Sequence, residues 1–226
     1  MASLDHVATL PPVSVRLPLI VAALEVEFPG DAPALCELDF ATPFQLLAAT
    51  ILSAQCTDRQ VNATTPGLFA RFPDAPAMAG ADRAELERLI FPTGFYRSKA
   101  DHLLQMAARL CAVYGGEVPT AMEDLVSLAG VGRKTANVVR SVGFGLPGLP
   151  VDTHVLRLSR RLDLVRSDDP VVVERRLNQR IDPAQGGALS LRLILHGRRT
   201  CDARSPRCQE CSLLQLCPTG LRRVPR

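Results

Sequence analysis

The sequence lacks any apolar run long enough to cross a membrane. Its longest uninterrupted apolar stretch covers residues 17–24, far below the roughly 18 to 20 residues that a spanning helix requires. The N-terminus has no charged region followed by a cleavage site, which excludes a typical secretion signal. With 47% hydrophobic and 22% charged residues, the composition also excludes a disordered or fibrous chain. We therefore expect a globular, cytoplasmic protein without membrane contacts.

Lysine is almost missing. The chain has 26 basic residues, of which only Lys99 and Lys134 are lysine. A guanidinium stays protonated in proteins and cannot act as an amine nucleophile, whereas a lysine amine can. Biased codon usage would also explain two surviving lysines, so the number alone assigns neither of them a role.

The positive charge is unevenly distributed. Residues 1–60 contain two basic and seven acidic residues, whereas residues 130–166 and residues 196–226 each contain seven basic and two acidic residues. Basic segments of this kind are typical of a surface that binds a polyanion, although a solvated charged surface explains them equally well.

Alternating strand patterns are missing too, whereas signals for the start of a helix recur. Each consists of a capping side chain before an apolar-periodic segment, with an acid or amide three residues later or a proline directly after it. Such caps occur at Thr42, Thr57, Ser98, Thr120, Asp169 and Asp182. The sequence predicts an all-α protein.

Two segments interrupt this helical pattern. Residues 143–150 (GFGLPGLP) are rich in turn formers and predict a loop between two parts of the chain. Pro66 and Gly67 lie inside an otherwise continuous helical pattern, where we expect a kink or an early stop.

A glycine-bounded turn follows the cap at Thr120. Gly130, Val131 and Gly132 separate two short helical patterns, and Arg133 and Lys134 open the second one. The glycines permit positive φ and a close backbone approach, while Val131 can attach the turn to the core. The start of the second helix would offer free N–H groups beside two cations, which favours an anion such as a DNA phosphate. A purely structural helical turn remains the alternative.

The chain has seven cysteines, four of them within 17 residues. Cys201, Cys208, Cys211 and Cys217 follow the spacing C-x6-C-x2-C-x5-C. Without a secretion signal, this spacing favours a metal site over a disulfide framework. Four thiolates suit either zinc or an iron-sulfur cluster. We interpret the remaining three, Cys36, Cys56 and Cys111, as buried small hydrophobic residues.

Taken together, four motifs resemble the endonuclease III family of DNA glycosylases. The segment LAGVGRKTANVV resembles the family's helix-hairpin-helix, and Val151–His154 resembles its VDTH motif. Upstream, LSAQCTD and GFYRSKA resemble an LSAQxTD loop and a GxYxxKA stretch. The resemblance covers residues 17–217, nearly the whole chain.

The resemblance implies a two-lobed helical fold. A helical barrel would occupy residues 37–147 and carry the hairpin at residues 121–141. The second lobe would combine residues 1–36 with residues 148–226 and contain a cluster loop at residues 201–217. The cysteine spacing then implies a [4Fe-4S] cluster with a structural and DNA-positioning role.

The resemblance also implies a bifunctional glycosylase and abasic-site lyase that removes oxidised pyrimidines from duplex DNA. Lys134 matches the family's amine nucleophile, and Asp152 matches its carboxylate. Gln55 would fill the hole left by the extruded nucleotide, with Phe95 as the neighbouring wedge. The amine must be partly neutral at working pH, and burial together with neighbouring cations would lower the pKa of Lys134 in that direction.

Each of these roles has a structural alternative. Asp152 can be a helix cap, Phe95 an ordinary core aromatic, and His154 a packing residue. We expect Gly130, Val131, Gly132 and Arg133 to contact the DNA backbone, together with Arg204 and Arg207 of the cluster loop. The partner would be duplex DNA with a damaged base or abasic site, bound by a monomer associated with the nucleoid.

The sequence departs from the family pattern at Ala129, at Phe95, at Cys56 and at Pro66-Gly67. These departures leave the range of lesions open. Three alternatives remain: a glycosylase of the same fold that uses water, a DNA-binding module without chemistry, and a zinc protein unrelated to repair. The first would not need Lys134, and the second would not need the pair of Lys134 and Asp152.

Overall fold

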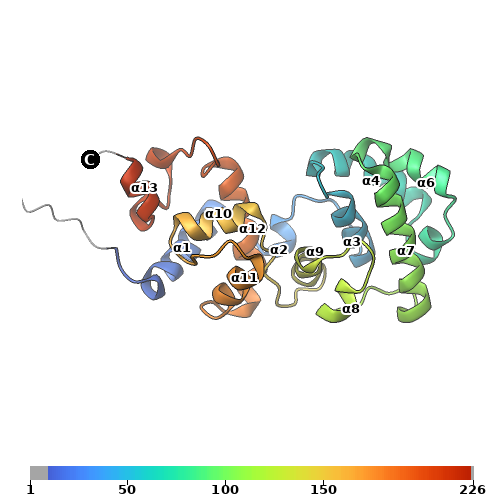
Figure 1. Ribbon diagram of the computed structural model, residues 1–226, viewed down its shortest axis with the longest axis horizontal. Coiled ribbons are helices and arrows are strands. Elements are labelled where there is room, and N and C mark those ends of the chain that lie inside the picture. The colour runs from blue at the N-terminus through green and yellow to red at the C-terminus, as the bar shows by residue number, and fades with distance from the viewer. Residues whose placement is uncertain (1–9, 225–226) are drawn as a thin grey trace, which may run out of the picture. The chain divides into compact units, whose positions relative to one another are not determined.

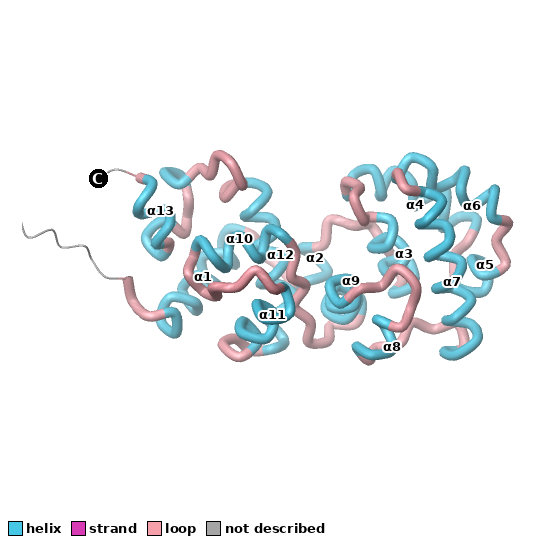
Figure 2. The backbone as a smooth tube through the Cα atoms, in the orientation of Figure 1, coloured by secondary structure: helices cyan, strands magenta, loops and turns pink. Residues whose placement is uncertain are grey.

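A computed structural model describes residues 10–224, and within this range the chain consists of helices and connecting loops with no strand (Figures 1 and 2). The all-α prediction is therefore confirmed. The chain divides into two compact units: residues 31–150 form one, and the residues before 31 and after 150 form the other. The sequence suggested divisions near residues 37 and 147. No helix of the described part is long and apolar enough to cross a membrane.

The unit of residues 31–150 is built around its longest helix, α7, which packs against α3, α5 and α6. A continuous apolar core fills the space between these helices, with Leu47, Leu68 and Leu103 fully buried in it. Its helices are α2 (Ala32–Leu35), α3 (Pro43–Leu52), α4 (Asp58–Arg71), α5 (Ala75–Ala79), α6 (Arg83–Ile90), η1 (Phe91–Thr93), α7 (Tyr96–Tyr114), α8 (Met122–Val126), α9 (Arg133–Val138) and the π-helical turn η2 (Val139–Gly143).

In the second unit, the central helix α12 packs against both α1 and α10. The first helix of the described residues therefore packs against a helix that begins about 170 residues later in the sequence. The helices of this unit are α1 (Val13–Glu27), α10 (Thr153–Arg161), α11 (Pro170–Asn178), η3 (Pro183–Gln185), α12 (Gly186–Arg199), η4 (Cys208–Glu210), η5 (Leu214–Leu216) and α13 (Pro218–Arg223).

Several helix starts follow directly from local sequence. The hydroxyls of Thr42 and Thr57 each accept a bond from the backbone N–H three residues later, at 3.2 Å. Asp169 caps α11 through Oδ1, which lies 2.8 Å from the backbone nitrogen of Val171. These side chains satisfy N–H groups that have no partner inside the helix. The caps predicted at these three positions are confirmed.

Two predicted caps are wrong, and of the kink or early stop expected at Pro66-Gly67, the early stop is excluded. The helix α7 begins at Tyr96, so Ser98 lies inside its first turn; α8 begins at Met122 after Ala121, so Thr120 is not its cap. The helix α4 continues through Pro66 to Arg71. Val61 and Leu68 are fully buried on either side of Pro66, so packing along this face compensates for the missing N–H bond.

The predicted loop at residues 143–150 is present. The turn η2 ends at Gly143, and α10 begins only at Thr153. Gly148 lets this loop lie against α9, because a Cβ there would be only 2.6 Å from the carbonyl oxygen of Asn137. A larger residue at this position would push the loop away from the helix.

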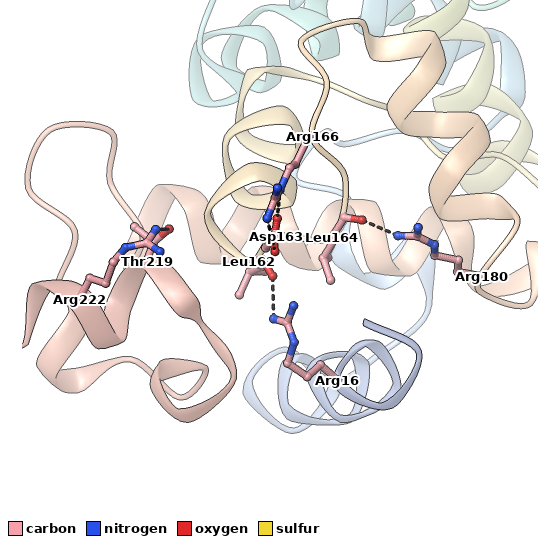
Figure 3. A network of polar contacts seen from close by, with 8 residues as sticks. All are labelled: Arg16, Leu162, Asp163, Leu164, Arg166, Arg180, Thr219 and Arg222. Atoms are coloured by element: carbon pink, nitrogen blue, oxygen red, sulfur yellow. Dashed lines mark hydrogen bonds and ion pairs between the residues drawn. The ribbon is translucent and has the colours of Figure 1, made fainter. Parts of the chain in front are cut away.

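A buried arginine attaches α1 to the rest of its unit. Arg16 is 3% exposed, and its Nη1 lies 2.8 Å from the carbonyl oxygen of Leu162 (Figure 3). The same nitrogen lies 2.8 Å from the carbonyl oxygen of Leu216. Its Nε also donates to the carbonyl of Pro11, at 2.8 Å. One guanidinium thus ties α1 to the end of α10 and to the segment just before Cys217.

The end of α10 is a Schellman turn. The N–H of Leu164 donates to the carbonyl of Ser159 at 2.8 Å, and the N–H of Asp163 to that of Arg160 at 3.0 Å. This geometry places Asp163 in the left-handed region, with φ of 53°. The bond from the Arg166 guanidinium holds the pKa of the Asp163 carboxyl below its usual value (Figure 3).

The backbone of Asp163 gives a test of this turn. We expect Asp163→Val to lower the free energy of unfolding by about 1–2 kcal/mol relative to Asp163→Gly, because a β-branched residue is strained at positive φ and glycine is not. Both variants lose the pair with Arg166, so their difference isolates the backbone. Urea unfolding followed by circular dichroism measures it. Equal stability of the two variants would contradict the left-handed assignment.

Candidate functional site

The glycine turn lies between α8 and α9, as its sequence predicts. Gly130 has φ of 76°, and a Cβ there would lie 2.9 Å from the Cβ of His102, so glycine is required. Gly132 instead has φ of −91° and open space where a Cβ would be. Val131 is buried, so it attaches the turn to the core. Only the first glycine is therefore needed for conformation.

The helix α9 begins without a side-chain cap at Gly132. Arg133 and Lys134, the first two residues of the helix, are both exposed. Lys134 therefore stands in solvent at the start of a helix. The first-turn N–H groups and the positive end of the helix dipole lie on the same side, so this end is suited to an anion.

Asp152 caps α10, the first helix after the loop. Its Oδ1 accepts bonds from the backbone N–H groups of His154 at 2.8 Å and Val155 at 3.0 Å. The structural alternative considered for Asp152 is thus confirmed. Both bonds end on the same oxygen, so Oδ2 is not part of the cap. Asp152 belongs to the unit that contains α10, whereas Lys134 belongs to residues 31–150.

Gln55 and Phe95 share an unusual backbone conformation. Their φ angles are 54° and 48°, and Asp163 is the only other non-glycine residue with positive φ in the described part of the chain. Both side chains are exposed, Phe95 by 67%, so Phe95 is not a core aromatic. Strained, exposed residues of this kind cluster at functional sites.

Lys99 lies four residues after Phe95 and, unlike the exposed Lys134, is buried. It is 3% exposed, and its Nζ donates to the carbonyl oxygens of Leu52 at 2.8 Å and Thr93 at 2.7 Å. Burial lowers the pKa of Lys99. Sequence reasoning assigned it no role, although it is the lysine of the GFYRSKA segment and one of only two lysines in the chain.

His154 packs between α10 and α12. Its Nδ1 lies 3.0 Å from Nη2 of Arg157, and a Cβ on Gly197 would be 2.8 Å from the same ring nitrogen. Burial lowers the pKa of His154, and Arg157 acts in the same direction. The histidine is a packing residue, as the sequence suggested.

The four clustered cysteines line a single pocket after α12, together with Arg161, Thr200 and Gly220. The pocket contains about 330 Å³ of space free of atoms, part of it open to solvent. Nitrogen donors point at the sulfurs: Arg161 Nη1 lies 3.1 Å from Cys201 Sγ, and the Gly220 nitrogen lies 3.2 Å from Cys217 Sγ. The cysteine spacing therefore brings all four sulfurs to one place.

Burial raises the pKa of the Cys211 thiol to about 11, with the neighbouring cysteines acting in the same direction. The pKa of Cys217 is raised for the same reason. A positively charged group is needed to hold such thiols as thiolates at neutral pH. In the part of the chain that the structure describes, no three His, Cys, Asp or Glu side chains are close enough to hold one metal ion.

The remaining cysteines and the loop arginines differ partly from expectation. Cys36, Cys56 and Cys111 are only half-buried.

Arg204 is exposed on the cluster loop, whereas Arg207 also donates to the backbone carbonyl of Arg199. Sequence reasoning missed Arg161, which donates to the carbonyl oxygens of residues 201–203 and so orders the start of the loop.

Proteins of known function resemble the chain over most of its length. The family described as "HhH-GPD superfamily base excision DNA repair protein" matches residues 48–183. Endonuclease III of Synechocystis sp. is 50% identical over 89% of this chain and 91% of the relative. Endonuclease III of Bacillus subtilis is 45% identical over 83% of this chain and 86% of the relative.

Two solved structures of endonuclease III with DNA also resemble the chain over most of its length. A non-covalent endonuclease III–DNA complex superposes with a TM-score of 0.86 at 41% identity, covering 93% of this chain and 97% of the other. A trapped endonuclease III–DNA covalent intermediate gives the same TM-score and identity, with 93% and 98% coverage. The chain therefore belongs to the endonuclease III family, within the HhH-GPD superfamily of base excision DNA repair proteins.

Proposed function

We propose that this protein is a bifunctional DNA glycosylase and abasic-site lyase that removes oxidised pyrimidines, such as thymine glycol, from duplex DNA. The observation that carries the proposal is the likeness to a trapped covalent endonuclease III–DNA intermediate over 93% of the chain, combined with an exposed lysine at the start of α9. A covalent intermediate requires a nucleophile, and Lys134 is the accessible amine next to the hairpin.

The chemistry assigned to Lys134 is amine attack on the sugar. The neutral amine attacks C1′, and the bond from C1′ to the base breaks as the base leaves with the electron pair and takes up a proton. Loss of a proton from the attached nitrogen and opening of the sugar ring give a Schiff base. Removal of a C2′ proton then expels the 3′ phosphate and nicks the strand.

The carboxylate of Asp152 supports this step. Its Oδ1 is held by two backbone N–H bonds of α10, which orients the carboxylate. We assign to it the stabilisation of positive charge on the sugar and help in deprotonating the amine. The same residue thus serves as a helix cap and in the reaction.

The other groups position the DNA. The turn Gly130–Gly132 and Arg133 would hold a phosphate at the start of α9, and Arg204 and Arg207 would contact the backbone from the cluster loop. Gln55 would fill the hole left by the extruded nucleotide, and Phe95 would wedge between base pairs. Their exposure and left-handed backbones support these two roles.

Cys201, Cys208, Cys211 and Cys217 would hold a [4Fe-4S] cluster. Their sulfurs share one pocket but are not close enough to hold a single ion, which favours a cluster of several atoms over zinc. Arginine and backbone N–H groups near the sulfurs suit a cluster that carries negative charge. Its role would be to order residues 201–217, since base excision requires no redox step.

The alternatives are less well supported. A water-using glycosylase of the same fold does not need an accessible amine, which this chain retains at Lys134. A binding module without chemistry has no use for Lys134 and Asp152 together. A zinc protein unrelated to repair disagrees with the family of the chain.

Borohydride trapping tests the role of Lys134. The wild-type protein should form a covalent adduct with a duplex carrying one thymine glycol, and Lys134→Ala should form none. Lys134→Arg is the matched control: it keeps the charge near a phosphate but cannot act as a nucleophile, so it should bind the duplex within about threefold of wild type and form no adduct. Base release without an adduct in the wild type would indicate the water-using alternative.

Two substitutions separate the roles of Asp152. Asp152→Asn keeps an oxygen for the cap but loses the charge, whereas Asp152→Ala loses both. We expect only the alanine variant to lose about 1 kcal/mol of unfolding free energy, while single-turnover excision should fall at least about 100-fold in both variants. Wild-type excision by Asp152→Asn would limit Asp152 to its capping role.

Iron and inorganic sulfide analysis tests the cofactor. The purified protein should contain about four of each per chain. Cys211→Ser should lose most of the iron, and Cys111→Ser, a half-buried cysteine in the other unit, should keep it. Stoichiometric zinc without sulfide would contradict the cluster.

A further inference from the structure

The ammonium of Lys99 is buried, and it joins two segments of the unit 31–150. Its two acceptors are the carbonyl oxygens of Leu52, 2.8 Å away, and Thr93, 2.7 Å away. Leu52 is the last residue of α3, and Thr93 is the last residue of η1. The negative ends of two helical segments therefore converge on one positive charge.

Each of these segments leads directly to a strained, exposed residue. Gln55 follows Leu52 by three positions, and Phe95 follows Thr93 by two. Both have positive φ, a conformation that persists only where the surrounding structure holds it. The Lys99 ammonium is thus bonded to the last residue of the helical segment that precedes each of them.

A lysine is a costly choice for a purely structural contact. Removing a charge from water is unfavourable, and burial lowers the pKa of Lys99, with the Cys56 side chain acting in the opposite direction. An ammonium offers three donors on one atom at the end of a long stem. This permits one side chain on α7 to reach carbonyls from two separate segments, which a shorter polar residue cannot do.

We propose that Lys99 is a positioning residue for base extrusion. Its ammonium would hold residues 53–57 and residues 91–95 at a fixed distance from each other, so that Gln55 and Phe95 enter the duplex together. The inference rests on the hole-filling and wedge roles proposed above. Without the ammonium, the two segments would move independently, and the entry of one side chain would no longer be coordinated with that of the other.

The first experiment removes the ammonium and keeps the stem. Lys99→Met should slow single-turnover excision from a thymine glycol duplex by about 10- to 100-fold, the loss expected from misplacement of about 1 Å. Met106→Ala is the matched control: Met106 is fully buried on the same helix, seven residues after Lys99, and donates no hydrogen bond to the carbonyl of Leu52 or Thr93. It should excise within about threefold of wild type although it also loses stability.

A double-mutant cycle identifies the residues through which Lys99 acts. Lys99→Met is combined with Gln55→Ala/Phe95→Ala, and excision is measured for all four proteins. If Lys99 acts by positioning this pair, its substitution should slow excision by less than about threefold once the pair is gone, because interacting residues are not additive. A general structural role predicts the same loss in both backgrounds.

The possible results separate the two proposals. If Gln55→Ala/Phe95→Ala slows excision and Lys99→Met adds its full effect to it, only the positioning role is overturned. If Gln55→Ala/Phe95→Ala excises like wild type, the hole-filling and wedge roles fail, and the positioning role fails with them. Should Lys99→Met not fold, Lys99→Gln, with one amide donor group on a shorter stem, takes its place in the same cycle.

Discussion

The fold depends on basic side chains that donate to backbone carbonyl groups. An all-α chain with many short helices leaves carbonyls at every helix end without a partner, and no sheet supplies N–H groups to them. Arg16 donates to Leu162 and Leu216, Arg161 to residues 201–203, and Lys99 to Leu52 and Thr93. A long cationic side chain can satisfy two or three such carbonyls at once, which places segments far apart in sequence next to each other.

Because basic side chains bond carbonyl groups within the chain, not all of the charge in the basic segments is available to a ligand. By sequence, residues 130–166 and 196–226 have the charge expected of a polyanion-binding surface, but several of their arginines have partners within the chain. Arg161 and Arg157 bond backbone carbonyls near Cys201, and Arg166 pairs with Asp163. Lys134 and Arg204 are exposed. Net charge along a sequence therefore overstates the charge available to DNA, because part of it stabilises the loops that hold the cysteines.

The features that the sequence predicted correctly depend on neighbouring residues, whereas it missed those that depend on distant ones. Caps at Thr42, Thr57 and Asp169 need only the next turn of helix, and they were found. The passage of α4 through Pro66 depends on tertiary packing. The hydrogen bonds of Lys99 could not be predicted from the sequence, because one of its acceptors lies 47 residues away.

The left-handed backbone conformation of Gln55 and Phe95 lowers the stability of the fold at two residues to which we assign a function. A non-glycine residue in the left-handed region costs about 1–3 kcal/mol, which is a large share of the 5–15 kcal/mol that holds a typical domain folded. Both residues are exposed, so burial of their own side chains does not offset this cost. The compensation must come from fixed neighbours, and Lys99 is bonded to the last residue of the helical segment that precedes each. An exposed side chain whose backbone conformation lowers stability is useful only if it contacts something outside the chain. A base stack opened by the extrusion of one nucleotide can accept both Gln55 and Phe95.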